Sequence, residues 1–156
     1  LAAQQYENSI GQFRKTLDMY PEDTTSLNLL MDVLIQTNQY LEAVSEYEKS
    51  SRRQNDTKAL ATAEELRRAY QDSGPSGFWK KALVHAEEEY QSGRRSEYEL
   101  AAVCVRAGDT DRAFELLKKS YEKKDADFCM LKMDPRFDPV RTDPRFSELV
   151  KLLKMS

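Results

Sequence analysis

Few residues in this sequence are of types that carry catalysis, and His85 is the only histidine. As a general base it needs a group that orients its ring, and Glu88 or Glu89 lies one helical turn further on. The plainer interpretation is a histidine on an ordinary helix, and we favour it.

The two cysteines and the three consecutive glutamates offer little more chemistry. Cys104 and Cys129 stand among apolar residues, which predicts buried thiols, and two cysteines alone make neither a disulfide framework nor a zinc site. The run Glu87-Glu88-Glu89 could bind a cation, but a solvated helix face explains it as well. The sequence has neither of the common glycine-rich phosphate-binding motifs. We therefore expect no enzyme, no cofactor and no metal.

Composition narrows the classes of function. The 156 residues are 33% charged and 40% hydrophobic, and no apolar run is long enough to span a membrane. The net charge is −3, and the basic pairs are scattered among acids, so nucleic acid is not an expected partner. The chain starts at Leu1 without a signal-like segment, and we expect it to be part of a longer protein. Its compartment stays open, with the cytoplasm favoured over the periplasm.

The elements that would position a site repeat along the chain. Tyr6, Ser9 and Phe13 recur as Tyr40, Ala43 and Tyr47, each pair 34 residues apart. The repeat continues, more weakly, around Trp79 and then clearly at Ala113, Leu117 and Ser120. Such a period is typical of stacked supersecondary units.

Each unit divides into two helices. Leu27, Leu30, Met31 and Leu34 have helical spacing, and a second apolar stripe starts at Ala43. In the last unit Gly108 predicts a helix end, and Asp109 predicts the cap of the next helix. No segment alternates with period two for long enough to indicate a strand. The sequence thus predicts an all-α fold of helical hairpins.

These patterns resemble the tetratricopeptide repeat family, with Leu27-x2-Leu30-Met31-x2-Leu34 followed by Ala43-x3-Tyr47. The spacing recurs at Glu97, Leu100, Ala101 and Cys104, followed by Ala113 and Leu117, while Arg67 and Trp79 depart from it. The resemblance implies a single solenoid domain with a C-terminal cap over residues 1–156. Its parts would be a half repeat (1–23), a repeat (24–59), a degenerate repeat (60–93), a repeat (94–124) and the cap (125–156).

The resemblance also implies a concave groove that takes a peptide or helix of a protein partner. Its residues by register would be Asn28, Asp32, Ile35, Gln36, Glu64, Arg68, Gln71, Tyr98, Val105 and Arg106. Tyr98 and Arg106 are the expected anchors. Asp32 replaces an asparagine of the family's clamp for chaperone C-terminal carboxylates, so we expect no binding of such tails. The leading hypothesis is a non-enzymatic interaction module, the regulatory or scaffold part of a larger bacterial protein.

A second hypothesis is self-association as a homodimer. The N-terminal half repeat lacks its first helix, so Ile10, Phe13 and Leu17 are expected to lie exposed. Such an uncovered apolar stripe marks a contact surface or missing sequence.

The C-terminal segment contains Asp-Pro-Arg-Phe twice, at 134–137 and 143–146. Asp followed by Pro is a helix-start signal, so we expect a final helix over 144–154 and short turns before it. The tail resembles segments that follow helical repeats in some bacterial transcription regulators and kinases. Arg136, Arg141 and Arg145 could form a docking or phosphate-binding loop. The alternative, which we favour, is a cap with Phe137 and Phe146 buried and the arginines paired with local carboxylates.

Overall fold

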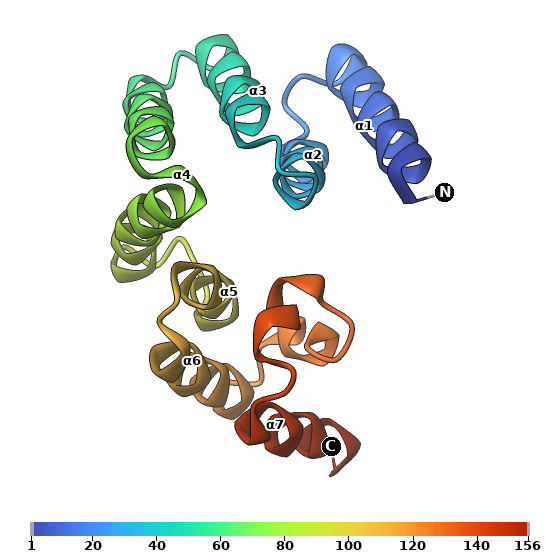
Figure 1. Cartoon of the computed structure of the whole chain (residues 1–156), viewed down its shortest axis with the longest axis vertical. Helices are drawn as coiled ribbons and strands as arrows, with labels where there is room; N and C mark the ends of the chain where they lie inside the picture. The colour runs from blue at the N-terminus through green and yellow to red at the C-terminus, as the bar shows by residue number, and fades with distance from the viewer. Residues whose placement is uncertain (1, 156) are drawn as a thin grey trace. The chain divides into compact units, whose positions relative to one another are not determined.

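The computed structural model describes residues 2–155, which form helices and turns without any strand (Figure 1). This confirms the all-α prediction. The seven α-helices are α1 (Ala2–Met19), α2 (Thr24–Gln36), α3 (Tyr40–Arg53), α4 (Thr57–Gln91), α5 (Glu97–Ala107), α6 (Thr110–Glu122) and α7 (Pro144–Met155). Two 3-10 helices, η1 (Ala126–Met130) and η2 (Pro135–Val140), lie between α6 and α7. The chain forms two compact units, residues 1–78 and 79–156, which are described separately.

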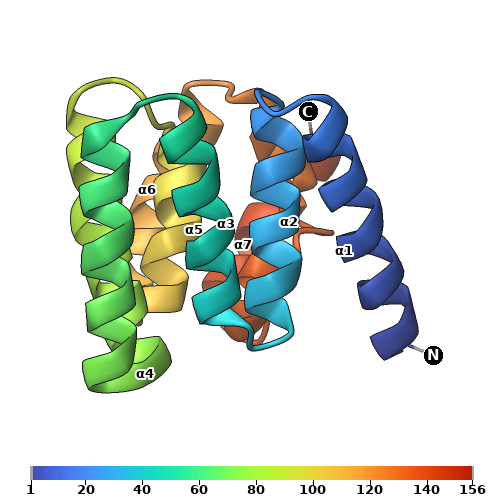
Figure 2. The same ribbon diagram turned by 90° about the horizontal axis from the view of Figure 1, so that it is seen from above.

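In the first unit, α1 packs against α2 and α2 packs against α3 (Figure 2). Leu30, Leu34 and Val44 are fully enclosed. Ile10 and Leu17 of α1 are also buried, at 8% and 7% exposure. The expectation that α1 leaves its apolar stripe uncovered is therefore corrected for Ile10 and Leu17, which α1 buries in packing against α2, while Phe13 is half-buried.

A sharp bend interrupts α4 after its first half. Gly74 has φ 63° and ψ −152°, a conformation that residues with a Cβ avoid, and Pro75 follows it. The helix is thus kinked at this position. Before the kink, Arg67 extends to Glu48 of α3, with 2.8 Å between Nη2 and Oε1. Near the end of the unit, Tyr40 stacks on Tyr70 and meets Phe78 edge-on, both at 5.0 Å.

Five helices, α2 to α6, end in the same way. In each, a residue with positive φ follows the helix, and the next amide donates to the carbonyl five residues back. This Schellman arrangement satisfies carbonyls that the last turn leaves without partners. The positive-φ residues are Asn38, Asn55, Gly93, Gly108 and Lys124. Gly108 ends α5 and the Asp109 side chain accepts from the Arg112 amide, as the sequence predicts.

Lys124 is the costly member of this set, because a lysine at φ 57° carries a Cβ into the left-handed region. We expect Lys124→Gly to raise the free energy of unfolding by about 0.5–1 kcal/mol, as measured by urea denaturation. Lys119→Gly, inside α6, is the control and should lower it by about 1 kcal/mol. A destabilised Lys124→Gly chain would contradict this assignment.

The turns of the hairpins α2–α3 and α5–α6 form the same backbone hydrogen bonds at an offset of 70 residues. The amide of Gln39 donates to Leu34 and that of Asp109 donates to Cys104; Asn38 and Gly108 occupy the equivalent left-handed positions. The small residues Ala43 and Ala113 are both buried at these helix crossings. Residues 70 positions apart in these two hairpins are therefore alike in local structure as well as in sequence.

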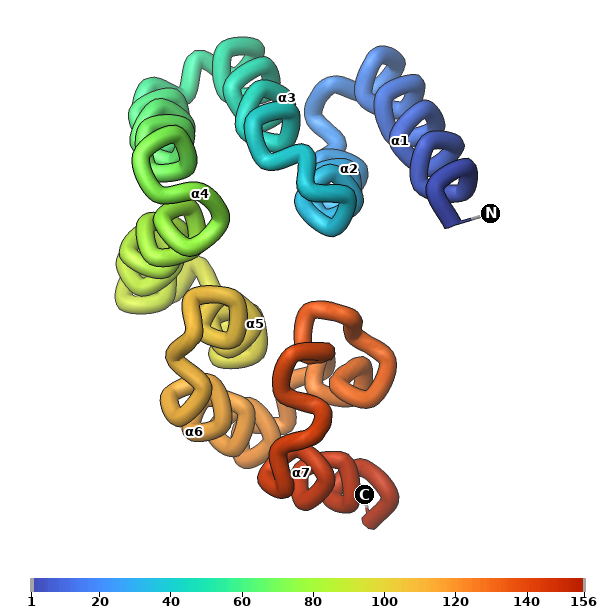
Figure 3. The backbone as a smooth tube through the Cα atoms, viewed as in Figure 1, coloured from blue at the N-terminus to red at the C-terminus, as the bar shows by residue number. Residues whose placement is uncertain are grey.

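In the second unit, α5 and α6 form a close antiparallel pair and α7 packs against α6. The tube in Figure 3 shows the chain winding through η1 and η2 before α7 begins. The helix predicted over 144–154 is present as α7, and Phe137 and Phe146 are buried, as expected. Asp134 accepts from the amide of Arg136 at the start of η2, and Asp143 accepts from that of Arg145 at the start of α7.

Candidate functional site

In the first unit, one face of α2 carries exposed side chains at helical spacing. Asn28, Asp32 and Gln36 follow one another at intervals of four residues, and all three are exposed. Leu29 beside them is also exposed, at 45%. We call these four residues the α2 face. Ile35, also expected in the groove, is buried at 8%.

The first half of α4 presents the other expected residues of this unit. Glu64, Arg68 and Gln71 are exposed, and the Arg68 guanidinium pairs with the Glu64 carboxylate one turn earlier. This pair is solvated, so it contributes little to stability. The arginine that departs from the repeat pattern, Arg67, points instead to α3.

In the second unit the expected anchors are not on an open surface. Tyr98 is 1% exposed and Val105 is 6% exposed, so neither side chain is available to a partner. Arg106 is half-buried, with its guanidinium 5.1 Å from the centre of the Trp79 ring. The expectation that Tyr98 and Val105 line a groove is thus corrected. The cover of Tyr98 comes from residues more than 30 positions further along the chain.

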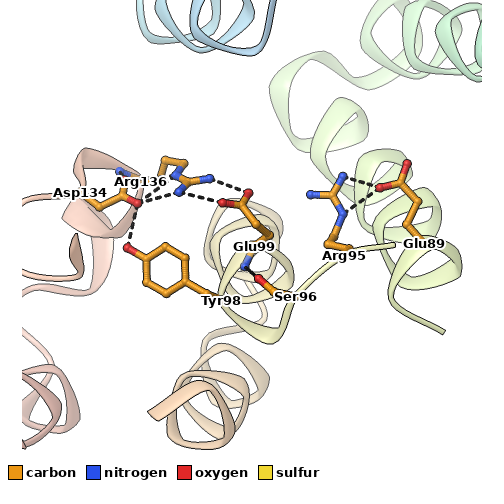
Figure 4. A network of polar contacts seen from close by, with 7 residues as sticks. All are labelled: Glu89, Arg95, Ser96, Tyr98, Glu99, Asp134 and Arg136. Carbon is orange, nitrogen blue, oxygen red and sulfur yellow. Dashed lines mark hydrogen bonds and ion pairs between the residues drawn. The ribbon is translucent and has the colours of Figure 1, made fainter. Parts of the chain in front are cut away.

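That cover is the start of η2, which lies against the N-terminal part of α5 (Figure 4). Tyr98 donates its hydroxyl to Asp134 Oδ2 at 2.9 Å, and its ring lies 5.2 Å from that of Phe137. Arg136 bridges two carboxylates, with Nη2 2.7 Å from Asp134 Oδ2 and Nη1 2.9 Å from Glu99 Oε2. Every charged group in this cluster therefore has a partner of opposite sign.

Burial and charge shift the pKa values in this cluster in opposite directions. Burial and the hydrogen bond to Asp134 raise the pKa of the Tyr98 hydroxyl far above its usual value. Burial alone would raise the pKa of Asp134, but the hydrogen bonds and charge of Arg136 outweigh it and lower that pKa. The tyrosine is therefore a neutral donor and the aspartate an ionised acceptor at neutral pH.

The second Asp-Pro-Arg-Phe segment repeats this geometry nine residues later. Arg145 Nη2 lies 2.9 Å from Asp143 Oδ2, and Arg145 Nη1 lies 2.8 Å from Asp111 Oδ1 on α6. Its guanidinium stands 4.4 Å above the Phe114 ring, as that of Arg136 stands 5.8 Å from the Tyr98 ring. Each segment thus clamps one arginine between its own aspartate and an acid on a preceding helix.

The third arginine of the tail, Arg141, is also engaged. Its Nε lies 2.5 Å from Asp138 Oδ1, and its two terminal nitrogens donate to the carbonyls of Lys132 and Asp134. The arginines are paired with local carboxylates and Phe137 and Phe146 are buried, as we expected from the sequence. A phosphate-binding loop would need arginines that are not already matched by carboxylates.

The two cysteines and the three consecutive glutamates lie in different surroundings. Cys104 is buried, which raises the pKa of its thiol to about 11, so it stays protonated at neutral pH. Cys129 is exposed and donates to the Ala126 carbonyl, which corrects the expectation of a buried thiol. Glu87 lies 2.6 Å from Arg112 and Glu89 lies 2.7 Å from Arg95, so arginines neutralise two of the three consecutive glutamates. Within residues 2–155, no group of three or more histidine, cysteine or acidic side chains could hold a metal ion.

The burial of one charged residue, Glu97, was not predicted from the sequence. Glu97, at a position that Leu27 occupies in the other hairpin, is 6% exposed. Its carboxylate accepts from the Tyr90 hydroxyl and pairs with the Lys123 ammonium, and this pairing lowers its pKa. The position of Glu97 on an apolar stripe could have predicted this pairing, because a buried carboxylate needs a partner of opposite charge.

No family model, curated protein or solved structure matches the chain. Among the helices of residues 2–155, none is both long and apolar enough to cross a membrane.

Proposed function

We propose that this chain is a non-enzymatic protein-interaction module of the helical-repeat type, which resembles tetratricopeptide repeats. In this proposal the hairpins are repeats, the segment after α6 is their cap, and the module belongs to a larger regulatory or scaffold protein of bacterial type. The offset of 70 that relates two hairpins by the same bonds supports the repeat. Partner binding would use the exposed face of α2, the first helix of its hairpin.

The α2 face carries the proposal. Its two amides, Asn28 and Gln36, can each donate to and accept from a partner backbone, and Leu29 supplies exposed apolar surface. α2 packs on α1 and α3 with its other faces, so this face is open to a partner. A surface with apolar and amide groups at fixed spacing suits a peptide or helix better than a small substrate.

Self-association through α1 has less support, since α1 covers Ile10 and Leu17 against its neighbours. We therefore propose that the chain binds a partner other than a second copy of itself.

Peptide display against the full chain tests this function. Peptides selected on the unaltered protein should lose at least tenfold in affinity for the variant Asn28→Ala/Asp32→Ala/Gln36→Ala. The matched control is Glu115→Ala/Lys118→Ala/Glu122→Ala, three exposed residues of α6, which should bind within twofold of the unaltered chain. Circular dichroism checks that both variants keep their helices. Selected peptides that bind both variants equally, or lose affinity only for the α6 variant, would overturn the assignment.

A further inference from the structure

One short turn, residues 123–125, separates α6 from everything that follows it in the second unit. Lys124 at its centre has φ 57°. The amide of Lys124 donates to the carbonyl of Tyr121, and that of Asp125 donates to the carbonyl of Ser120. In a continued α-helix the same two amides would donate to the same two carbonyls in the other order. The turn therefore gains no hydrogen bond from these amides over a straight helix.

The local sequence favours the straight helix at this turn. Four of the five helix ends of this kind have glycine or asparagine in the left-handed position, whereas α6 has a lysine. Lysine is among the better helix formers and is disfavoured at positive φ. No glycine or proline occurs between Thr110 and Asp134. The local preference and the observed turn therefore disagree, which the other four helix ends avoid.

The apolar pattern of α6 also continues through the turn. Two series at intervals of seven residues cross it: Phe114, Tyr121 and Phe128, and Leu117, Lys124 and Leu131. Only Lys124 in these series is neither apolar nor aromatic, and such spacing is typical of one amphipathic helix. Because Pro135 disfavours helical backbone at the residue before it, a helix that passes through the turn would end at about residue 133.

Residues 134–156, which we call the tail, are held on α5 and α6 by side-chain contacts. Phe137 and Phe146 are buried in the core that these helices share with the tail. Arg136 pairs with Glu99 of α5, and Asp134 accepts from the Tyr98 hydroxyl at 2.9 Å. A tail from a second copy of the chain can make every one of these contacts.

A straight α6 would take the tail away from its own α5. The N-terminus of α5 lies beside the end of α6, where Lys123 pairs with Glu97. Continuing α6 from residue 123 to residue 133 would lengthen it by about 16 Å. Asp134 would then begin the tail about 16 Å beyond Lys123, too far to reach Tyr98 of the same chain. The vacated face would be complementary to the tail of a second copy.

We propose that two copies of this chain exchange tails, so that residues 134–156 of each pack on α5 and α6 of the other. In this dimer α6 runs straight to about residue 133, and Lys124 leaves the left-handed region. The clamp contacts are the same in both forms, so the turn and the protein concentration decide between them. All exchanged residues belong to the second unit, so this inference goes beyond partner binding at the α2 face and does not depend on it. Each dimer carries two α2 faces, which would strengthen its binding to a partner with two segments.

Size-exclusion chromatography with light scattering tests the role of the turn on the full chain, held at about 1 mM before separation. We expect a dimer beside the monomer. Lys124→Gly should lower the dimer fraction at least fivefold, because glycine accepts the left-handed turn and disfavours the straight helix. Lys124→Ala is the matched control, which removes the ammonium but keeps a Cβ, and its dimer fraction should equal or exceed that of the unaltered chain. Absence of a dimer in the unaltered chain, or an equal dimer fraction in Lys124→Gly, would overturn the proposal.

Mixing two variants tests whether the tail crosses between copies. Glu99→Arg and Arg136→Glu each place like charges in the clamp of a single chain. In the mixture, exchange sets the unaltered Arg136 of one chain against the unaltered Glu99 of the other. Native mass spectrometry should then show the heterodimer at least fivefold more abundant than either homodimer. If either variant fails to fold alone, the circular dichroism of the mixture should still exceed the sum of its parts. A mixture with neither the heterodimer nor this gain would overturn the exchange.

Discussion

Replacing Arg136 with alanine should lower the free energy of unfolding by about 2–3 kcal/mol. The substitution leaves the Asp134 carboxylate, whose side chain is only 9% exposed, without its cation, and it removes the cation of Glu99 as well. Breaking a fully buried pair by removing one partner costs about 3–5 kcal/mol, and the partial exposure of Arg136 and Glu99 reduces that figure. Urea denaturation measures the change.

The second clamp supplies a matched control. Arg145→Ala removes the same kind of bonds from a more exposed place, since Asp111 is 88% exposed and Arg145 is 43% exposed. Solvent screens these charges, so we expect a loss of about 1 kcal/mol or less. Equal losses for the two variants would show that burial of the Asp134 carboxylate has no energetic consequence.

The same cluster should make stability depend on pH. The folded-state pKa of Asp134 is lower than its unfolded value near 3.8, so its contribution is fully present above that value. It is lost as the pH falls from about 3.8 through the folded-state pKa, because protonation then removes the charge that Arg136 binds. The Arg136→Ala chain should show a smaller loss of stability over this interval.

Replacing Phe137 with alanine should lower the free energy of unfolding by about 3–5 kcal/mol. The ring is fully buried against Tyr98 and joins the tail to α5, so its removal loses apolar burial and leaves a cavity. Thermal and urea unfolding measure the loss. Met133→Ala, four residues earlier at 76% exposure, should change stability by less than about 0.5 kcal/mol. A small effect of Phe137→Ala would mean that the tail is not part of the core of the second unit.

Local signals in the sequence predicted local structure well. Gly108 with Asp109, and Asp143 with Pro144, mark a helix end and two helix starts that the structure contains. These signals work because caps and left-handed turns depend on residues a few positions apart.

Contacts over long separations were harder to predict. Nothing near Tyr98 in the sequence shows that Asp134 and Phe137, more than 30 residues later, cover it. The same holds for Ile10 and Leu17, which are buried within the chain, and for Cys129, which is exposed although Phe128 and Leu131 near it are buried. The sequence predicted that the arginines of the tail would pair with carboxylates. It did not predict that Arg136 would pair with Glu99 and Arg145 with Asp111.

The most direct measurement on the central claim is an amide chemical-shift titration of the full chain by NMR. The ligand is the tightest peptide from display, added in steps to the labelled protein. The account predicts that the largest shifts fall on the amides of Asn28, Leu29, Asp32 and Gln36, while those of α6 and α7 stay unchanged. Largest shifts on α6 or α7, with α2 unmoved, would contradict it.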